Sequence, residues 1–190
     1  MPHDEKRFDP QRKGFLLGAE REAHWQPLHF LARLGLVPGQ TVLDLGSGPG
    51  FWTLPLAQIV GADGKVIALD DSRELLDDLA ARNPPAQVRL LPSSLPAIDL
   101  PDQSVDLAWA AFVFHEVEPP QRLAAELRRV VRPSGRIAVL DWRPDAAGEA
   151  GPPRGHRVGP DQVAAYLAAA GFADPVLTWQ DEDTYLVETG

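Results

Sequence analysis

From residue 40 onward, short apolar stretches of strand-forming residues alternate with segments that have a helical pattern. Five of these stretches are predicted as strands, and they cover residues 41–45, 65–70, 87–91, 105–110 and 136–141. Alternation of strands with helices is typical of an α/β fold, in which helices connect parallel strands. The sequence therefore predicts a mostly parallel sheet covered by helices.

Three helices have clear boundary signals. Asp71, with Glu74 three residues later, resembles a capping box and predicts a helix start. Pro119-Pro120 predicts the start of a second helix, which the Pro-Ser-Gly run at 133–135 should end. A third helix is predicted within 160–171, between Pro160 and a terminal glycine. Each helix falls between two predicted strands, as the α/β pattern requires.

The chain is predicted to be a single domain, residues 1–190, because it contains neither repeats nor low-complexity tracts. We divide it into a cap segment with a helix (1–36), a core (37–142), a loop (143–159), and a C-terminal helix and hairpin (160–190, with strands near 175–179 and 184–188). Long loops in compact domains are often functional, so the 143–159 loop is a candidate part of a site.

Charge and composition limit the possible partners. The chain has 190 residues and a net charge of −9, whereas nucleic-acid binders usually carry a basic surface. The densest basic group, Arg128, Arg129 and Arg132, is predicted to lie at a solvated helix end, where cations complement the helix dipole. We therefore expect no nucleic-acid partner.

Other features are missing from the sequence. There are no cysteines, so disulfides, thiolate metal sites and cysteine nucleophiles are excluded. His3, His24 and His29 do not have metal-ligand spacing, so no metal is expected. No apolar run approaches the roughly 18 residues that span a bilayer, and the charged N-terminus lacks a secretion signal. The sequence predicts no membrane segment and, by default, a cytoplasmic location.

A glycine-rich loop follows the first predicted strand. Glycines occupy positions 46, 48 and 50, where the absence of a Cβ lets the backbone approach a ligand closely. Asp70 ends the second strand, 24 residues after Gly46, and its carboxylate can accept hydrogen bonds from a ribose diol. A dinucleotide fingerprint requires Gly-x-Gly-x-x-Gly, but here Phe51 occupies the place of the third glycine. The spacing therefore disfavours NAD(P) as the ligand.

The same run resembles a known motif. Residues 42–50 (VLDLGSGPG) are similar to the first motif of class I S-adenosylmethionine-dependent methyltransferases, and 66–70 (VIALD) to the second. Residues 95–96 with 100–107, and then 127–136, resemble the family's later regions in the same order. The resemblance covers about residues 25–190 and is closest to the small-molecule branch, typified by ubiquinone/menaquinone-biosynthesis-type enzymes.

The resemblance implies a fold and a cofactor site. The fold would be a Rossmann-like three-layer sandwich with a mostly parallel seven-stranded sheet whose last strand is antiparallel. The cofactor would be S-adenosyl-L-methionine, with Asp70 on the ribose hydroxyls. The implied cofactor-binding residues are Asp44, Gly46, Ser47, Gly48, Gly50, Asp70, Asp71, Ser94, Leu95 and Ala110.

Two positions depart from the family's pattern. The family often has Asp near the adenine amino group, but Ser93-Ser94 stand here, so a hydroxyl, a backbone group and Leu95 would have to recognise adenine. Pro55 falls early in the helix after the glycine loop. A proline is tolerated only in the first helical turn, so that helix should begin near Thr53 or be distorted.

The implied reaction is methyl transfer to an unidentified small-molecule acceptor, which leaves S-adenosylhomocysteine. Two alternatives stay open: a non-catalytic S-adenosylmethionine-binding protein of the same fold, and, less favoured by the glycine spacing, a nucleotide-dependent oxidoreductase. An arsenite methyltransferase is disfavoured, because that branch binds arsenic through cysteines. The acceptor, its accepting atom and the oligomeric state are left open.

His115 is the candidate catalytic residue, because it follows the fourth strand at the loop that faces the methyl group in the family. An unperturbed imidazole titrates near pH 6.5, so it can accept a proton at neutral pH. Glu116 could orient the ring. The alternative, slightly favoured, is structural: His115 would cap the next helix or bond a backbone carbonyl.

The N-terminal segment and the long loop are predicted to cover the cleft. Arg21 and Trp25 would cap the methionine end of the cofactor, or Trp25 would simply pack on the sheet. His156 and Arg157 would contact an anionic substrate, although solvated loop residues are commoner. Together, residues 1–26 and 143–159 should exclude large polymers.

Overall fold

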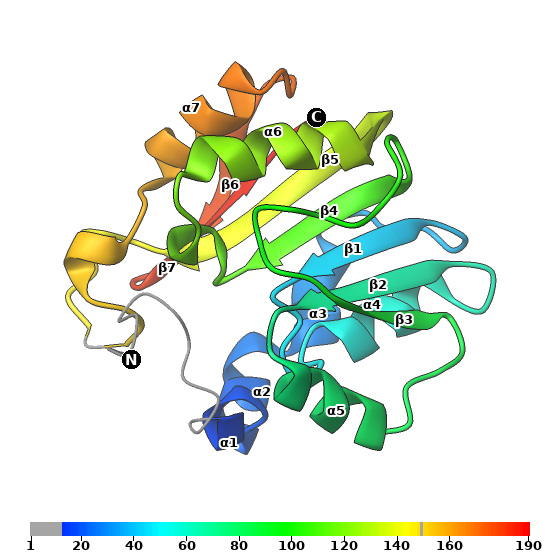
Figure 1. The fold of residues 1–190 in the computed structure, drawn as a ribbon. Coiled ribbons are helices and arrows are strands. Elements are labelled where there is room, and N and C mark those ends of the chain that lie inside the picture. Colours follow the sequence, from blue (N-terminus) through cyan, green and yellow to red (C-terminus); the bar gives the residue numbers. More distant parts are fainter. Residues whose placement is uncertain (1–12, 149) are drawn as a thin grey trace.

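A seven-stranded sheet forms the centre of the protein (Figure 1). The computed structural model describes residues 13–148 and 150–190. The strands, in the spatial order β3-β2-β1-β4-β5-β7-β6, are β1 (Thr41–Leu45), β2 (Lys65–Asp70), β3 (Val88–Pro92), β4 (Val105–Ala111), β5 (Val131–Trp142), β6 (Val176–Gln180) and β7 (Thr184–Glu188). Strands β1 to β5 are parallel, and β7 runs antiparallel to both of its neighbours. The predicted Rossmann-like α/β fold with an antiparallel last strand is confirmed.

Helices form a layer on each side of the sheet. They are α1 (Lys13–Leu16), α2 (Ala19–Trp25), α3 (Pro27–Ala32), α4 (Thr53–Val60), α5 (Arg73–Ala81), α6 (Pro120–Val130) and α7 (Pro160–Ala169), with the short 3₁₀ helices η2 (Phe114–Glu116) and η3 (Arg154–His156). Apolar side chains of α6 and α7 are buried against one face of the sheet, and those of α3 and α4 against the other. None of the helices in the described ranges is long and apolar enough to cross a membrane.

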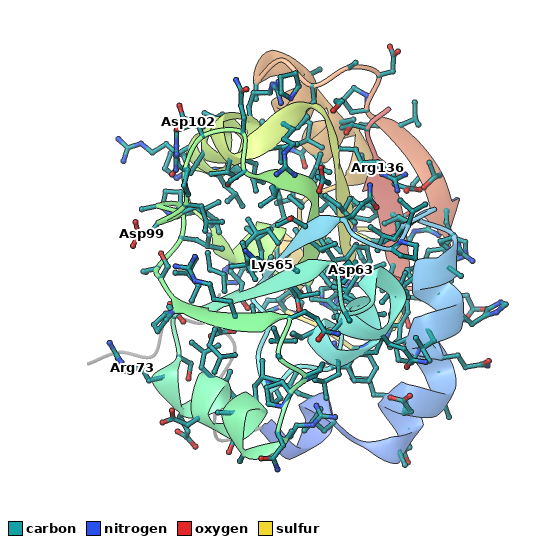
Figure 2. The ribbon with its side chains drawn as sticks, turned by 90° about the vertical axis from the view of Figure 1, so that its right-hand side faces the viewer. Asp63, Lys65, Arg73, Asp99, Asp102 and Arg136 are labelled. Carbon is teal, nitrogen blue, oxygen red and sulfur yellow. The ribbon has the colours of Figure 1, made fainter. Side chains whose placement is uncertain are left out.

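Polar side chains lie at the amino ends of the strands. The guanidinium of Arg136, at the start of the core part of β5, donates to the backbone carbonyl of Leu34 after α3 (Figure 2). Asp63 and Lys65 lie at the turn that leads into β2, at the amino end of that strand (Figure 2). The carboxyl ends of the parallel strands all lie at the opposite edge, where the glycine loop begins.

Two helix boundaries differ from the sequence prediction. Helix α5 is capped by Ser72, whose hydroxyl accepts from the N–H of Leu75 at 3.3 Å, because the Asp71 side chain lies one residue too early. Strand β5 begins directly after α6, at Val131. The 133–135 run does not end a helix but lies in a bulge, since Val131 pairs with Val105 while Arg136 pairs with Leu107. Helix α4 begins at Thr53, as expected from Pro55.

Candidate functional site

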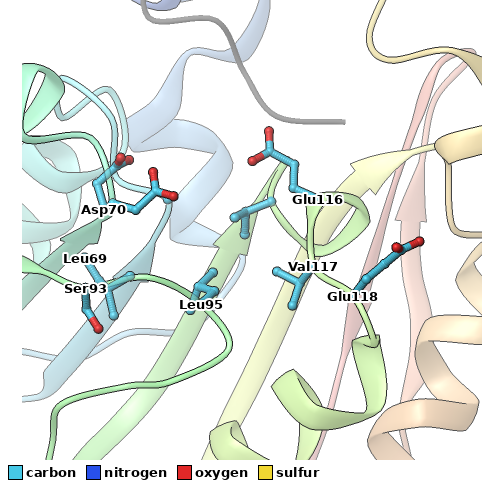
Figure 3. A pocket seen from close by; sticks show the side chains of 10 residues that line it. Leu69, Asp70, Ser93, Leu95, Glu116, Val117 and Glu118 are labelled. Carbon is cyan, nitrogen blue, oxygen red and sulfur yellow. The ribbon is translucent and has the colours of Figure 1, made fainter. Parts of the chain in front are cut away.

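The strand order changes direction at β1, which makes this strand the topological switch point of the sheet. Strands β2 and β3 add on one side of β1, and β4 adds on the other. In open α/β sheets, ligands bind at the carboxyl ends of the strands beside such a switch point. A pocket of about 320 Å³ lies there (Figure 3). Its lining comes from the ends of β1, β2, β3 and β4 and the loops that follow: Gly46, Leu69, Asp70, Asp71, Ser93, Leu95, Val113, Glu116, Val117 and Glu118.

The glycine loop has a backbone that only glycine accepts without strain. Gly46, Gly48 and Gly50 have φ angles of 62°, 53° and 87°, in the left-handed region. A Cβ on Gly46 would lie 2.9 Å from a methyl of Val113, and one on Gly50 would lie 2.4 Å from Leu79. The loop is therefore packed on both sides, and it presents bare backbone to the pocket at Gly46.

Asp70 ties the glycine loop to the end of β2. One carboxylate oxygen accepts from the N–H of Gly48 at 2.8 Å, and the other accepts from the N–H of Ser72 at 2.9 Å. Burial raises the pKa of Asp70, although the two backbone hydrogen bonds oppose this rise and the charge of Asp71 adds to it. The same carboxylate lines the pocket, so Asp70 both shapes the loop and faces the ligand space.

Asp44 lies beneath the loop, almost fully buried at the end of β1. Its Oδ2 accepts from the hydroxyl of Thr53, the first residue of α4, at 2.6 Å. Its Oδ1 has no hydrogen-bond partner among the described residues. Burial raises the pKa of Asp44 to about 7, despite the hydrogen bond from Thr53, and the charge of Asp70 raises it further. Asp44 is thus a buried carboxyl group in which one oxygen has no hydrogen-bond partner among the described residues.

We expect Asp44 to make the ligand-free protein less stable as pH rises. Its pKa is higher in the folded chain than in the unfolded chain, so folding favours the protonated form. The stabilisation is present below about pH 4 and lost as pH rises to about 7, and a shift of this size corresponds to as much as about 4 kcal/mol. Urea unfolding at several pH values should show wild type losing stability relative to Asp44→Asn over this window. A constant difference between the two proteins would contradict the assignment.

Four acidic side chains line the pocket. They are Asp70, Asp71, Glu116 and Glu118 (Figure 3). Each carboxylate oxygen can accept more than one hydrogen bond. The lining is therefore suited to a ligand that carries hydrogen-bond donors.

Several residues predicted to bind the cofactor lie outside this lining. Ser93 and Leu95 line the pocket, whereas Ser94 is exposed beside them. Ala110 is fully buried in β4, and Ser47 is buried with no partner for its hydroxyl among the described residues. The sequence did not point to Leu69, Val113, Val117 or Glu118. Val113, Val117 and Glu118 follow β4. The sequence placed His115 after the same strand, and this position was the signal that could have found its three neighbours.

His115 is buried in η2 and does not line the pocket. Its Nδ1 lies 2.7 Å from Oδ1 of Asp141, and its backbone N–H donates to Oδ2 of the same residue at 3.1 Å. Burial by itself would lower the pKa of His115, but the charge and hydrogen bond of Asp141, with the charge of Glu116, outweigh it and raise the pKa. Asp141, rather than Glu116, orients the ring, since Nε2 lies 4.0 Å from the Glu116 carboxylate.

Arg21 and Trp25 lie on α2 beside the glycine loop. Trp25 is buried in an aromatic cluster whose ring centroids lie 4.9–6.0 Å from its own, formed by His24, Phe30, Trp52, Phe112 and Trp179. The guanidinium of Arg21 lies 4.7 Å from the ring of Phe51 and 5.5 Å from that of Phe112. Burial lowers the pKa of Arg21 to about 10, and its Nε finds no hydrogen-bond partner among the described residues. Arg21 is thus a largely buried cation with an unused donor.

The loop after β5 is held by Arg157 from within the loop and by Tyr185 of β7. Arg157 is buried and donates to the carbonyls of Arg143, Ala150 and Pro152. The hydroxyl of Tyr185 donates to the carbonyl of Val158 at 2.7 Å. Arg157 therefore closes the loop and is buried rather than solvated. The predicted cover by residues 1–26 falls partly on residues 1–12, which lie outside the described ranges.

The predicted basic cluster does lie at the end of α6, with Arg128 and Arg129 in its last turn, and the side chains of Arg129 and Arg132 stay about a third exposed. Arg129 and Arg132 form ion pairs with Asp102 and Asp106 at 2.7 Å and 2.6 Å. The Arg128 guanidinium lies 5.2 Å from the ring of Phe172. These partly solvated side chains are thus also engaged within the fold, because the loop before β4 brings Asp102 to Arg129 and the start of β4 brings Asp106 to Arg132.

Comparison with known proteins identifies the family. A model of the methyltransferase domain matches residues 43–139, slightly more than half of the chain. The structure of a SAM-dependent methyltransferase from Aquifex aeolicus superposes with a TM-score of 0.88 at 31% identity, and the match covers 96% of this chain and 98% of that one.

Two curated relatives carry more specific names. An arsenite methyltransferase from Halobacterium salinarum is 32% identical over 150 residues, which are 77% of this chain and 37% of the relative. A ubiquinone/menaquinone biosynthesis C-methyltransferase from Marinomonas is 30% identical over 118 residues, 60% of this chain and 47% of the relative. The chain thus spans less than half the length of these two relatives. It belongs to the methyltransferase-domain family, as a class I S-adenosylmethionine-dependent methyltransferase domain.

Proposed function

We propose that the protein transfers the methyl group of S-adenosylmethionine to a small organic acceptor and releases S-adenosylhomocysteine. The observation that carries this proposal is the pocket at the switch point, which Gly46 of the glycine loop and Asp70 at the end of β2 line together. A glycine there lets a ligand approach the backbone closely, and the Asp70 carboxylate can accept hydrogen bonds from the hydroxyls of a ribose. Phe51 stands where a dinucleotide fingerprint has its third glycine, which disfavours NAD(P).

The amino-acid end of the cofactor fits three buried polar atoms around the glycine loop. Asp44 and Ser47 flank Gly46 and have an unused carboxylate oxygen and hydroxyl, and Arg21 has an unused Nε next to Phe51. Buried polar groups are nearly always hydrogen-bonded, so such atoms indicate a ligand or water. The carboxyl group of Asp44 would accept from the α-ammonium group of the cofactor, and the Arg21 guanidinium would donate to its α-carboxylate. The neutral hydroxyl of Ser47 could bond either group.

The rest of the cofactor would lie along the ends of β2 and β3. The Asp70 carboxylate would accept from the ribose hydroxyls, with Asp71 beside it. Leu95 would offer an apolar surface to adenine. The remaining proposed contacts are the backbone of Gly46, Gly48 and Gly50. The predicted contacts of Ser94 and Ala110 stay predictions, because both residues lie outside the pocket lining.

The chain's own contribution to the reaction would be alignment. Holding a nucleophile and a methyl group in line at near-contact distance supplies much of the acceleration of a bimolecular reaction. His115 would then have a structural role, because its ring is buried against Asp141 and lies outside the pocket lining. If it is instead a general base, His115→Gln should slow single-turnover transfer by about 10²–10⁴-fold with cofactor affinity unchanged.

The relatives' names suggest two acceptor classes, quinone precursors and arsenite. The chain has no cysteine, so it offers no thiolate to hold trivalent arsenic. We therefore favour a carbon, oxygen or nitrogen nucleophile on an organic molecule.

Thermal-shift measurements with S-adenosylmethionine, S-adenosylhomocysteine, NAD and NADP test the cofactor. A ligand that binds only the native state raises the melting temperature, and only the first two should do so. Methyl-labelled cofactor should then label hydroquinones or phenols rather than arsenite or RNA. Binding without transfer to any acceptor would favour a non-catalytic cofactor-binding protein, and stabilisation by NAD alone would overturn the proposal.

Arg21 gives a separate prediction for the carboxylate of the cofactor. Arg21→Leu should weaken binding of S-adenosylhomocysteine by about 10–100-fold, because a hydrogen bond to a charged group contributes about 1.5–3 kcal/mol. Binding of 5′-methylthioadenosine, which lacks the amino-acid end, should be unchanged. Calorimetry with both ligands makes the comparison, and Arg33→Leu is the matched control, since Arg33 also lies over aromatic rings. Equal losses for both ligands would show that Arg21 merely stabilises the fold.

A further inference from the structure

The loop that joins β3 to β4 supplies two pocket residues and has no secondary structure of its own. Ser93 and Leu95 lie in the pocket lining at its start. The hydroxyl of Ser93 donates to the carbonyl of Ala97 at 2.9 Å, and its N–H donates to the carbonyl of Asp70 at 3.1 Å. The first bond closes a turn over residues 93–97, and the second ties the start of this turn to the end of β2. The position of Leu95 within this turn therefore also depends on how the residues that follow the turn are held.

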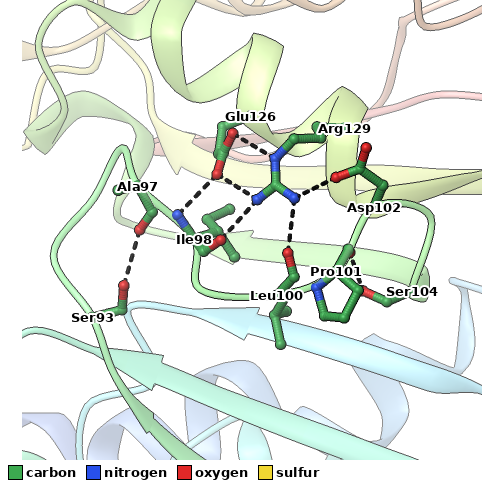
Figure 4. Close-up of polar contacts among 9 residues, drawn as sticks. All are labelled: Ser93, Ala97, Ile98, Leu100, Pro101, Asp102, Ser104, Glu126 and Arg129. Carbon is green, nitrogen blue, oxygen red and sulfur yellow. Dashed lines mark hydrogen bonds and ion pairs between the residues drawn. The ribbon is translucent and has the colours of Figure 1, made fainter.

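A single side chain of α6 holds the next part of the loop (Figure 4). Arg129 donates to the carbonyl of Ile98 and to that of Leu100, both at 2.8 Å, and to the carboxylate of Asp102 at 2.7 Å. Its remaining donors bind Glu126 at 2.6 Å and 2.9 Å. An arginine has five N–H donors in a rigid planar fork, so every one of them is used here.

Glu126 completes the attachment from the same helix. Its Oε1 accepts from the N–H of Ile98 at 3.1 Å as well as from Arg129. The pair therefore binds both the N–H and the C=O of Ile98 (Figure 4). Ile98 itself is buried in the core, so its backbone is fixed from two sides.

The anchor is close enough to control the pocket. Leu95 precedes Ile98 by only three residues, and a chain spans at most about 3.3–3.6 Å per residue. The other end of the turn is fixed by the pairing of Pro92 with Asp70 in the sheet. Residues 93–97 are thus held between two fixed points, and releasing the Ile98 end would let Ser93 and Leu95 move.

We propose that Arg129, together with Glu126, is a positioning residue for the adenine end of the cofactor. It acts from outside the pocket, by holding the 93–98 turn so that Ser93 and Leu95 keep their places in the lining. This inference rests on the proposed function, because it takes the base of S-adenosylmethionine to lie against this turn. A lysine cannot replace the arginine fully, since its ammonium group lacks the planar fork.

Calorimetry with the cofactor product and an analogue that differs from it only at the base tests this role. S-adenosylhomocysteine carries the adenine amino group, and S-inosylhomocysteine carries a carbonyl oxygen there. Arg129→Gln should weaken the binding of S-adenosylhomocysteine by about tenfold or more, which is the effect of losing roughly one well-made hydrogen bond. It should also reduce the preference for the adenine ligand, and Arg129→Lys should give an intermediate result.

Arg132→Gln is the matched control, because it removes the same charge from a nearby ion pair, with Asp106, that does not hold the loop. It should leave both affinities within about twofold of wild type, a difference well below the effect of one hydrogen bond. If Arg129→Gln does not fold, Glu126→Ala removes the acceptor for Ile98 and should lower the adenine preference in the same way.

Two results would overturn the inference. One is unchanged affinity for S-adenosylhomocysteine in a folded Arg129→Gln or Glu126→Ala variant. The other is an equal loss for both ligands, which would indicate general destabilisation. Failure of the wild-type protein to bind S-adenosylhomocysteine at all would instead refute the proposed function, so the two failures are distinguishable.

Discussion

Asp70→Asn should reduce the affinity for S-adenosylhomocysteine by about 10²-fold or more. The aspartate would accept from the ribose hydroxyls, and hydrogen bonds to a charged group contribute about 1.5–3 kcal/mol each. Its carboxylate also accepts from Gly48 and Ser72 with different oxygens. An asparagine of the same size has one acceptor oxygen and turns an amide N–H₂ toward one of those donors. The variant thus loses a ligand contact and the tie that shapes the glycine loop.

Calorimetry on a folded variant measures this loss. Asp63→Asn is the control, because it also removes one carboxylate charge but lies on the turn before β2, at the far end of that strand (Figure 2). It should bind like wild type. An Asp70→Asn protein that binds S-adenosylhomocysteine as wild type does would show that the pocket is not the cofactor site.

Asp141→Ala should cost about 3–5 kcal/mol of the free energy of unfolding, the usual effect of removing one partner of a buried ion pair. The variant leaves the buried His115 ring without its Nδ1 partner and the His115 backbone N–H without its acceptor. The end of β4 would then lose its polar connection to β5. Loss of this connection should be visible as lower protection of the η2 amides from hydrogen exchange.

The loss should depend on pH with a defined sign. The pKa of His115 is raised in the folded protein, so the pair's contribution is fully present below the unfolded value of about 6.5. It declines as pH rises through the folded value. Urea unfolding at pH 6 and pH 9 should therefore show a larger difference between wild type and Asp141→Ala at pH 6. Asp145→Ala, which removes an exposed partner of Arg143, is the control and should change little at either pH.

The candidate site was only partly predictable from sequence. The glycine loop and Asp70 were found because close backbone approach and a strand-terminal acid leave marks within short stretches of sequence. Ser93 was passed over in favour of Ser94, because which of two adjacent residues faces a pocket depends on the local path of the loop. Glu118 carried no signal of its own, since a single acid after a strand resembles any solvated loop residue.

The sequence by itself determined the order of strands and helices along the chain and the place of the candidate pocket. The family resemblance added that the last strand is antiparallel. The element order and the place of the pocket follow from local periodicity and from the rule that ligands bind at strand ends beside a switch point. Only the tertiary structure decided the partners of the buried polar groups. His115 meets Asp141 26 residues away, and Arg129 holds Ile98 across 31 residues. Such contacts have no local pattern, because they arise when separate loops and helices are packed against the same sheet.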